Sequence, residues 1–239
     1  MKVAPSGSSR LGSDLPYVTI SFAMSLDGKI ATRTGDSKYI SGPESLAFVH
    51  RLRDAHDAIL VGINTILADH PRLTARLPEG GGRDPHRVIL DSTLRIPLDE
   101  PVLHAASPAK TILVCREDAD PVRRAALERL GAVVVAVPDP HDPEGLRRAI
   151  RLLKAAGIGS ILVEGGASIH FAFLGNRLFD RVFVTVAPLI IGGATARTAV
   201  AGNGFATLAE SVRLRFVDRM DAGNDIIIEA LPADAGERA

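Results

Sequence analysis

The sequence has little of several features that mark particular classes of protein. It holds one cysteine, Cys115, and no tryptophan, and aromatic residues make up 4% of its 239 residues. A single cysteine excludes an internal disulfide and a metal site built from several cysteines, which fits a reducing cytoplasm. Few aromatic side chains leave few surfaces on which bases stack, so single-stranded nucleic acid is an unfavoured ligand.

Net charge and long apolar runs are also lacking. The formal net charge is zero, and no basic stripe of the kind that binds nucleic acid is evident. There is no secretory signal pattern and no apolar run of about 18 residues, so we expect a cytoplasmic protein without a membrane partner. The histidines show no metal-ligand spacing, and neither a nucleophile elbow nor a Walker loop occurs.

What the sequence does contain is an alternation of apolar strand-like runs and helical patterns. Strands are predicted over 18–23, 58–62, 86–91, 110–115, 132–137, 160–164 and 181–188, and helices over 43–55, 64–68, 121–130, 144–156 and 167–174. Such units predict an α/β protein of three layers, α/β/α, with a mostly parallel sheet. Two further strands, over 211–220 and 225–231, add an antiparallel C-terminal hairpin. We expect one domain, 15–231, between a disordered arm, 1–14, and a flexible tail, 232–239.

Polar segments, several of them rich in glycine, follow the predicted strands rather than precede them. They cover residues 25–41, 62–76, 91–95 and 164–168. Ligands of parallel sheets collect at the carboxyl ends of the strands, so these segments predict a shared small-molecule site. The start of the helix after Gly165-Gly166 suits a phosphate, as do Arg72 and Arg76. Each segment also has a structural alternative, such as a tight turn or a local ion pair.

Two side chains are candidates for acid–base work. Lys29 lies in the polar loop after the first strand, and Glu164 ends an apolar strand, where a carboxylate needs a partner. Because no nucleophile arrangement is present, we favour redox chemistry in which a cofactor brings the hydride and the protein supplies position and protons.

Several motifs, in this order, resemble the riboflavin-pathway pyrimidine reductases, which form the reductase half of a bifunctional deaminase–reductase and share a dihydrofolate-reductase-like fold. The matching stretches are Ala23–Lys29, Gly35–Gly42, Arg51–Arg53, Asp57–Thr74, Val88–Pro97, Val163–Ala167 and Ala187–Gly193. The resemblance extends from Tyr17 to Leu231.

The resemblance implies an NADPH-dependent reductase that opens the ribosyl ring of a ribosylaminopyrimidine 5′-phosphate to a ribityl chain. Lys29 and Glu164 are its implied catalytic residues. The implied substrate contacts are Ser37, Arg53, Leu73, Arg76 and Glu164. The implied NADPH contacts are Ala23, Tyr39, Thr65, Asp69, Ser92, Gly165, Gly166, Ala167 and Ser168, the last four at the pyrophosphate. The resemblance implies a homodimer and no metal.

The sequence departs from this family in two respects. Tyr39 stands where the family often has tryptophan, and only sixteen residues and no zinc-deaminase signature precede Tyr17, so we expect no deaminase activity. The substrate is left open between the deaminated and the diamino pyrimidine. A dihydrofolate or pterin reductase, with Asp27 or Glu164 at the pteridine, and a non-catalytic NADPH-binding protein are the alternatives.

Overall fold

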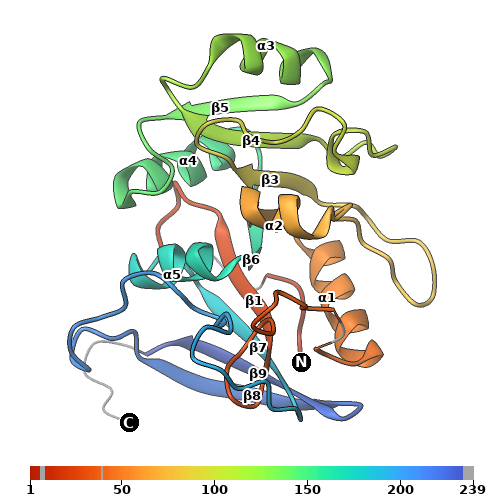
Figure 1. Ribbon diagram of the computed structural model, residues 1–239, viewed down its shortest axis with the longest axis vertical. Helices are drawn as coiled ribbons and strands as arrows, with labels where there is room; N and C mark the ends of the chain where they lie inside the picture. The colour runs from red at the N-terminus through yellow and green to blue at the C-terminus, as the bar shows by residue number, and fades with distance from the viewer. Residues whose placement is uncertain (6–8, 39, 234–239) are drawn as a thin grey trace.

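Runs of valine, isoleucine and leucine form a mixed sheet of nine strands (Figure 1). The computed structural model describes residues 1–5, 9–38 and 40–233. The strands are β1 (Tyr17–Ser25), β2 (Ala58–Gly62), β3 (His86–Leu90), β4 (Thr111–Arg116), β5 (Val133–Val137), β6 (Ser160–Gly165), β7 (Arg181–Ala187), β8 (Leu214–Ala222) and β9 (Asp225–Pro232). The helices are α1 (Pro43–Ala55), α2 (Ile63–Asp69), the 3-10 turn η1 (Pro101–Leu103), α3 (Pro121–Arg129), α4 (Pro143–Ala155) and α5 (Ala167–Gly175).

The order of strands in the sheet is β5-β4-β3-β2-β6-β1-β7-β9-β8. The strands from β5 to β7 are parallel, and β9 is antiparallel to both β7 and β8. The chain therefore runs outward from β2 to β5 and then returns to place β6 between β2 and β1. This arrangement puts the carboxyl ends of β1, β2, β3 and β6 side by side, as the sequence predicts.

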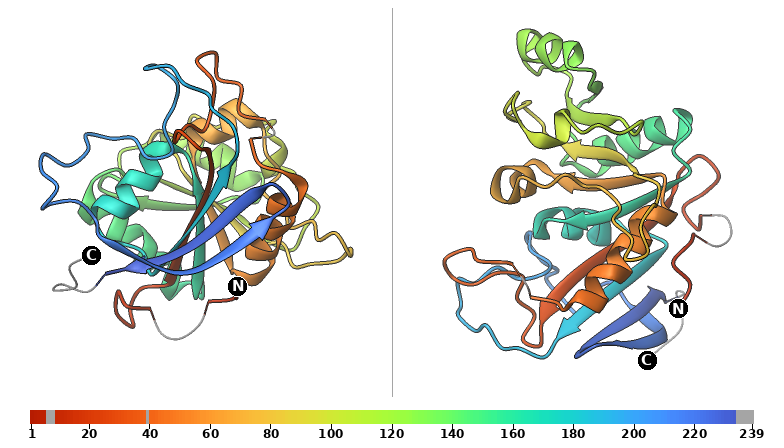
Figure 2. Two further views of the ribbon diagram at one scale, coloured as in Figure 1. Left: turned by 90° about the horizontal axis from the view of Figure 1, so that it is seen from below. Right: turned by 90° about the vertical axis from the view of Figure 1, so that its right-hand side faces the viewer.

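Helices cover both faces of the sheet (Figures 1 and 2). Alternate residues of each strand point to opposite faces. Leu60 and Val163 pack with α4 and α5 on one face, and Ile59 and Leu162 pack toward the other. Helices α2 and α3 cover the second face near Ile59, and Phe48 of α1 covers it near Leu162. The predicted three-layer α/β/α fold is confirmed.

Two local predictions differ from the structure. The second helix begins at Ile63, with Gly62 at its N-cap and no side-chain cap, so Asn64 does not cap it. The Asn64 side chain instead accepts a hydrogen bond from Arg95. Strand β8 begins three residues later than predicted, at Leu214, and it is largely exposed, so alternation with a buried face does not mark its start. No helix among the described residues is long and apolar enough to cross a membrane.

The disordered arm expected over residues 1–14 stays a prediction, although its described residues, 1–5 and 9–14, include several that make contacts close to β7. Where the structure describes this segment, Ser9 donates to Asp180 at 3.0 Å, and Arg181 donates to the carbonyls of Lys2 and Val3 at 3.0 and 2.9 Å. These partners lie 171 to 179 residues away in the sequence, so local composition does not reveal them. At the other end, β9 extends to Pro232, and residues 234–239 lie outside the described residues.

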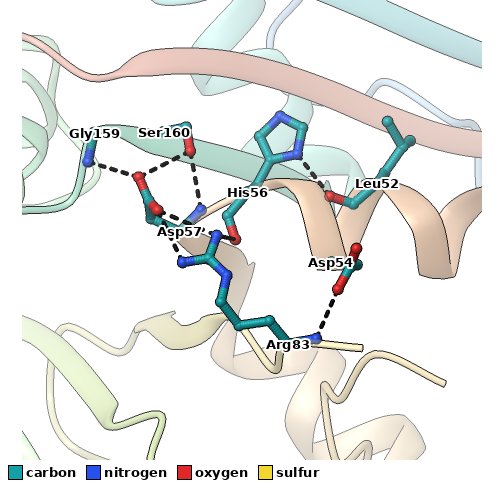
Figure 3. Close-up of polar contacts among 7 residues, drawn as sticks. All are labelled: Leu52, Asp54, His56, Asp57, Arg83, Gly159 and Ser160. Carbon is teal, nitrogen blue, oxygen red and sulfur yellow. Dashed lines mark hydrogen bonds and ion pairs between the residues drawn. The ribbon is translucent and has the colours of Figure 1, made fainter. Parts of the chain in front are cut away.

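A polar cluster ties together the amino ends of β2 and β6, at the edge opposite the polar loops (Figure 3). Asp57 accepts hydrogen bonds from the Gly159 amide at 3.0 Å and the Ser160 hydroxyl at 3.1 Å, and it pairs with Arg83. Burial alone would raise the pKa of Asp57, but these donors and the Arg83 charge outweigh it and lower the pKa. The cluster therefore favours the parallel register of β2 against β6.

His56, next to this cluster, is fully buried (Figure 3). Its Nδ1 lies 2.7 Å from the Leu52 carbonyl, which only accepts, so Nδ1 carries the proton and Nε2 accepts from the Thr19 hydroxyl at 2.8 Å. Burial lowers the pKa of His56 to about 4. The folded protein thus holds a neutral imidazole that the unfolded chain protonates below pH about 6.5.

This depressed pKa predicts an acid-sensitive contribution to stability. The stabilisation is fully present above pH about 6.5 and is lost as the pH falls to about 4, a change of about 3 kcal/mol. Urea unfolding at pH 7 and pH 4 should therefore show a smaller pH dependence for His56→Gln than for the wild type. The matched substitution of the exposed His104 should leave the wild-type dependence unchanged, and equal dependence in all three proteins would contradict the assignment.

Candidate active site

Polar side chains from four neighbouring parallel strands meet at one edge of the sheet. Lys29 follows β1, Thr65 lies on α2 directly after β2, and Ser92 follows β3. Glu164 and Gly165 end β6, which lies between β1 and β2. The structure thus brings together the segments that the sequence predicts to share a site. The described residues contain no group of acidic, histidine or cysteine side chains that could hold a metal ion.

An ion pair between Arg53 and Glu164 occupies the centre of this edge. Arg53 Nε donates to Glu164 Oε1 at 2.8 Å, and Nη2 donates to Oε2 at 2.5 Å, which is a bidentate geometry. The two side chains are only 15% and 12% exposed. Burial opposes the charge of Arg53, but the carboxylate of Glu164 outweighs it and raises the pKa of Arg53. The position of Glu164 at the end of an apolar strand predicts that its carboxylate needs a partner. Arg53 is that buried cationic partner.

The segment after α2 places a second arginine beside Arg53. Arg53 Nη1 donates to the Thr74 carbonyl at 3.1 Å, and Arg76 Nη2 lies 3.4 Å from Nε2 of His50. Burial, together with the charges of Arg53 and Arg76, lowers the pKa of His50. Leu73 has a buried side chain and a backbone φ of 53°. A non-glycine residue in this left-handed region is strained, and such strain is often found at binding sites.

The glycine turn at the end of β6 leads into the start of α5 beside Thr65. A Cβ atom on Gly166 would lie 3.5 Å from the Thr65 hydroxyl, and Gly165 has a φ of 140°, which disfavours other residues. The first N–H groups of a helix lack intrahelical partners and attract anions. Across β2, the hydroxyl of Ser92 and Oδ1 of Asp91 are buried without a hydrogen-bond partner among the described residues. These features fit an extended phosphorylated cofactor.

The other predicted cofactor contacts, together with the predicted substrate contact Ser37, are placed as follows. Ala23 is half-buried on β1, opposite Thr185 of β7, and Ser37 is half-buried in the loop between β1 and α1. Asp69 and Ser168 are exposed, at the end of α2 and the start of α5. Ala167 is half-buried. Tyr39 lies outside the described residues.

Residues 188–201 after β7 cross beside the loop that carries Lys29 (Figures 1 and 2), although the sequence predicts no role for them. Lys29 Nζ donates to the Ala196 carbonyl at 3.3 Å, and the backbone of Lys29 forms an isolated antiparallel β-bridge with Thr198. The Ala199 amide donates to Gly28 at 3.1 Å. Residues 187–193 match a family motif, and this match is the feature of the sequence that points to the segment.

The same segment also contacts the start of α5 through His170. This side chain is buried, its Nδ1 lies 2.8 Å from the Ala199 carbonyl, and its ring packs 5.0 Å from that of Phe22 on β1. The Ala201 amide donates to Ala167 at 3.1 Å. The 188–201 segment therefore joins the Lys29 loop to the glycine-rich turn.

Comparison with known proteins agrees with this arrangement. The family model described as the RibD C-terminal domain matches residues 16–228. The chain belongs to the RibD C-terminal domain family. A relative from Methanothermobacter thermautotrophicus, named 2,5-diamino-6-ribosylamino-4(3H)-pyrimidinone 5′-phosphate reductase, is 43% identical over 215 residues, which are 90% of this chain and 97% of that protein. The resemblance stated from the motifs is confirmed.

Solved structures of the RibD family share the fold. RibD of Acinetobacter baumannii superposes with a TM-score of 0.80 at 29% identity, covering 92% of this chain and 59% of that chain. Dihydrofolate reductase of Enterococcus faecalis matches with a TM-score of 0.52 at 14% identity, covering 91% of this chain and 97% of that chain. The predicted dihydrofolate-reductase-like fold of this RibD-family chain is confirmed.

The buried ion pair predicts a large stability effect at the site. Glu164→Gln leaves the Arg53 charge without its carboxylate, so we expect a loss of about 2 kcal/mol, below the full cost of breaking a buried pair because both side chains retain some solvent contact. Glu128→Gln, in the exposed pair with Arg124, should cost less than about 0.5 kcal/mol. Urea unfolding measures both, and equal losses would contradict the central place of the Arg53–Glu164 pair.

Proposed function

We propose that this protein is an NADPH-dependent oxidoreductase that converts the ribosyl group of a ribosylaminopyrimidine 5′-phosphate to the ribityl form. Family membership and the reaction named for the 43% identical relative support this proposal. The observation that carries it is the convergence of the Lys29 loop, the Arg53–Glu164 pair and the start of α5 on one edge of the sheet. The diamino pyrimidine named for that relative is the first substrate to test.

NADPH would supply the hydride. The turn at Gly165-Gly166 and the start of α5 would hold its pyrophosphate, with Thr65 beside it. Ser92 has a buried hydroxyl without a partner among the described residues, which suits a further cofactor contact. Ala23 and Asp69, at the ends of β1 and α2, complete our proposed set within the described part of the chain. Tyr39 keeps its proposed role from sequence alone.

Arg76 and His50 would recognise the substrate phosphate. Arg76 is exposed and bonded only weakly, at 3.4 Å to both Thr74 and His50, so its guanidinium is free to turn toward an anion. Arg53 is held rigidly by Glu164 and the Thr74 carbonyl, and it would form the wall of the substrate site with Leu73 and Ser37. Glu164 would then orient Arg53 rather than exchange protons.

Lys29 would supply the proton. Opening the ribosyl ring breaks the bond from C1 to the ring oxygen, which takes a proton and becomes a hydroxyl, while the amine nitrogen forms a double bond to C1. A hydride then adds to C1 of this iminium and returns the nitrogen to a neutral amine, so the conversion consumes one hydride and one proton. Lys29 follows the carboxyl end of β1, and its one side-chain hydrogen bond to a described residue, to the Ala196 carbonyl at 3.3 Å, is long enough to yield to a substrate oxygen.

Reduction of dihydrofolate is the weaker candidate. A pteridine site of that kind needs a carboxylate that is free to face the ring, and the two candidates are Asp27 and Glu164. Glu164 is engaged by Arg53 through both oxygens, and Asp27 is engaged by Ser25 and by two backbone amides of the 188–201 segment. Intact Lys29, Arg53 and Arg76 likewise disfavour a non-catalytic NADPH-binding protein.

NADPH absorbance measured with the ribosylaminopyrimidine phosphates and with dihydrofolate tests the proposal. We expect turnover of a pyrimidine and none of dihydrofolate. Lys29→Ala should lower kcat by about 100-fold, the usual size of a lost general acid, with little change in NADPH affinity. Lys110→Ala, an exposed lysine at the opposite edge of the sheet, should keep the wild-type rate. Turnover of dihydrofolate alone would overturn the substrate, and an unchanged Lys29→Ala rate would overturn the role of Lys29.

We also propose that the protein is a homodimer that pairs through β8. This strand lies at the edge of the sheet, and it exposes Phe216 at 73% and Val217 at 38%. Leu208, just before it, is 81% exposed. An exposed edge strand that carries apolar side chains is an aggregation hazard unless another chain covers it.

Substitution of Phe216 tests the dimer. A charge at the centre of an apolar interface weakens association, so Phe216→Glu should be a monomer at concentrations where the wild type is a dimer. Size-exclusion chromatography with light scattering measures both masses. The control is Val122→Glu, which alters a 72% exposed apolar residue on α3. A monomeric wild type would contradict the proposed homodimer.

A further inference from the structure

Asp27 lies in the turn between β1 and Lys29, and its carboxylate reaches across to the 188–201 segment. Its Oδ1 accepts from the Ser25 hydroxyl at 2.6 Å and from the Ile191 amide at 3.1 Å, and its Oδ2 accepts from the Gly192 amide at 2.7 Å. A carboxylate has only acceptor oxygens, so it matches these donors without any rearrangement. Asp27 is itself exposed, which means that packing does not explain its geometry.

The same contacts fix the backbone from which Lys29 projects. The Ser25 hydroxyl donates to Asp27 and accepts from the Lys29 amide at 2.9 Å. The Leu26 amide donates to the Leu189 carbonyl at 2.9 Å. A chain of hydrogen bonds therefore leads from Gly192 through Asp27 and Ser25 to Lys29.

The backbone of both partners is shaped for this contact. Gly28 has a φ of 80° and Gly192 a φ of 68°, in the left-handed region that glycine adopts without strain. Hydrogen bonds from the Ser25 hydroxyl, which has the largest effect, and from the Ile191 amide lower the pKa of Asp27 to about 2. The carboxylate is thus charged throughout the range in which the enzyme is expected to work.

We propose that Asp27 is a positioning residue, which clamps residues 191–192 over the β1 turn and so holds Lys29 at the reacting sugar. This inference rests on the proposed function and adds a role to it, since the proposed cofactor and substrate contacts do not include Asp27. The clamp also assigns a purpose to the Ala187–Gly193 motif, which the sites for cofactor and substrate leave unused.

Asp27→Asn tests the clamp because it keeps the shape of the side chain but replaces one acceptor oxygen with a donor group. Amide hydrogen exchange at Ile191 and Gly192 should become at least about tenfold faster, because their hydrogen bonds open more often. With the pyrimidine substrate, kcat should fall by about tenfold or more through misplacement of Lys29, with NADPH affinity unchanged. Asp27→Ser, which also removes the carboxylate, should change both readouts in the same direction. The exposed Asp99→Asn is the matched control and should change neither.

A double-mutant cycle separates positioning from a merely structural role. If Asp27 acts through Lys29, Asp27→Asn should lower kcat by less than about twofold when Lys29 is already alanine. Unchanged exchange in Asp27→Asn would overturn the clamp, and faster exchange with wild-type kcat would overturn the positioning role. Failure of the wild type to reduce any pyrimidine would contradict the proposed function instead. The exchange measurement uses no substrate, so it would still decide whether the clamp exists.

Discussion

The insertion of β6 between β1 and β2 is the constraint on which the site depends. The chain runs outward from β2 to β5 and then returns through α4. Glu164 and Gly165 therefore lie beside the ends of β1 and β2, which come much earlier in the sequence. The Asp57 cluster ties β2 to β6 at the opposite edge. Since a shift of one residue would turn Glu164 to the other face of the sheet, the register of β6 decides whether the Arg53–Glu164 pair forms.

The site separates charges that are engaged from charges that are free. The carboxylates of Glu164 and Asp27 are held by Arg53 and by backbone amides, respectively. Within the described part of the chain, the side chains of Lys29 and Arg76 make only long hydrogen bonds, of 3.3 and 3.4 Å. Arg53, Glu164 and Asp27 therefore build the site, whereas Lys29 and Arg76 remain for an anionic, oxygen-rich substrate. This division suits a sugar phosphate better than a basic pteridine ring.

Much of the fold follows from local patterns in the sequence, while the decisive contacts of the site do not. The bounds of α1 and β2 are predicted correctly because Pro43 marks the first turn and an uninterrupted apolar run marks the strand. The edge strand β8 is exposed, so its start escapes pattern analysis. The Arg53–Glu164 pair spans 111 residues and the Asp27–Gly192 contact spans 165, and both require the order of the strands. Motif resemblance predicts the members of these pairs but not that they bind each other.

In the proposed reductase, one edge of the sheet would bring a nicotinamide cofactor and the ribosyl carbon C1 together above the end of β1. Reduction of the diamino pyrimidine ribose phosphate with NADPH deuterated at the transferable C4 position tests it most directly. We expect a single deuterium on C1 of the new ribityl chain, as read by proton and carbon NMR of the product. Deuterium on the pyrimidine ring, or a ribityl product without deuterium, would contradict it.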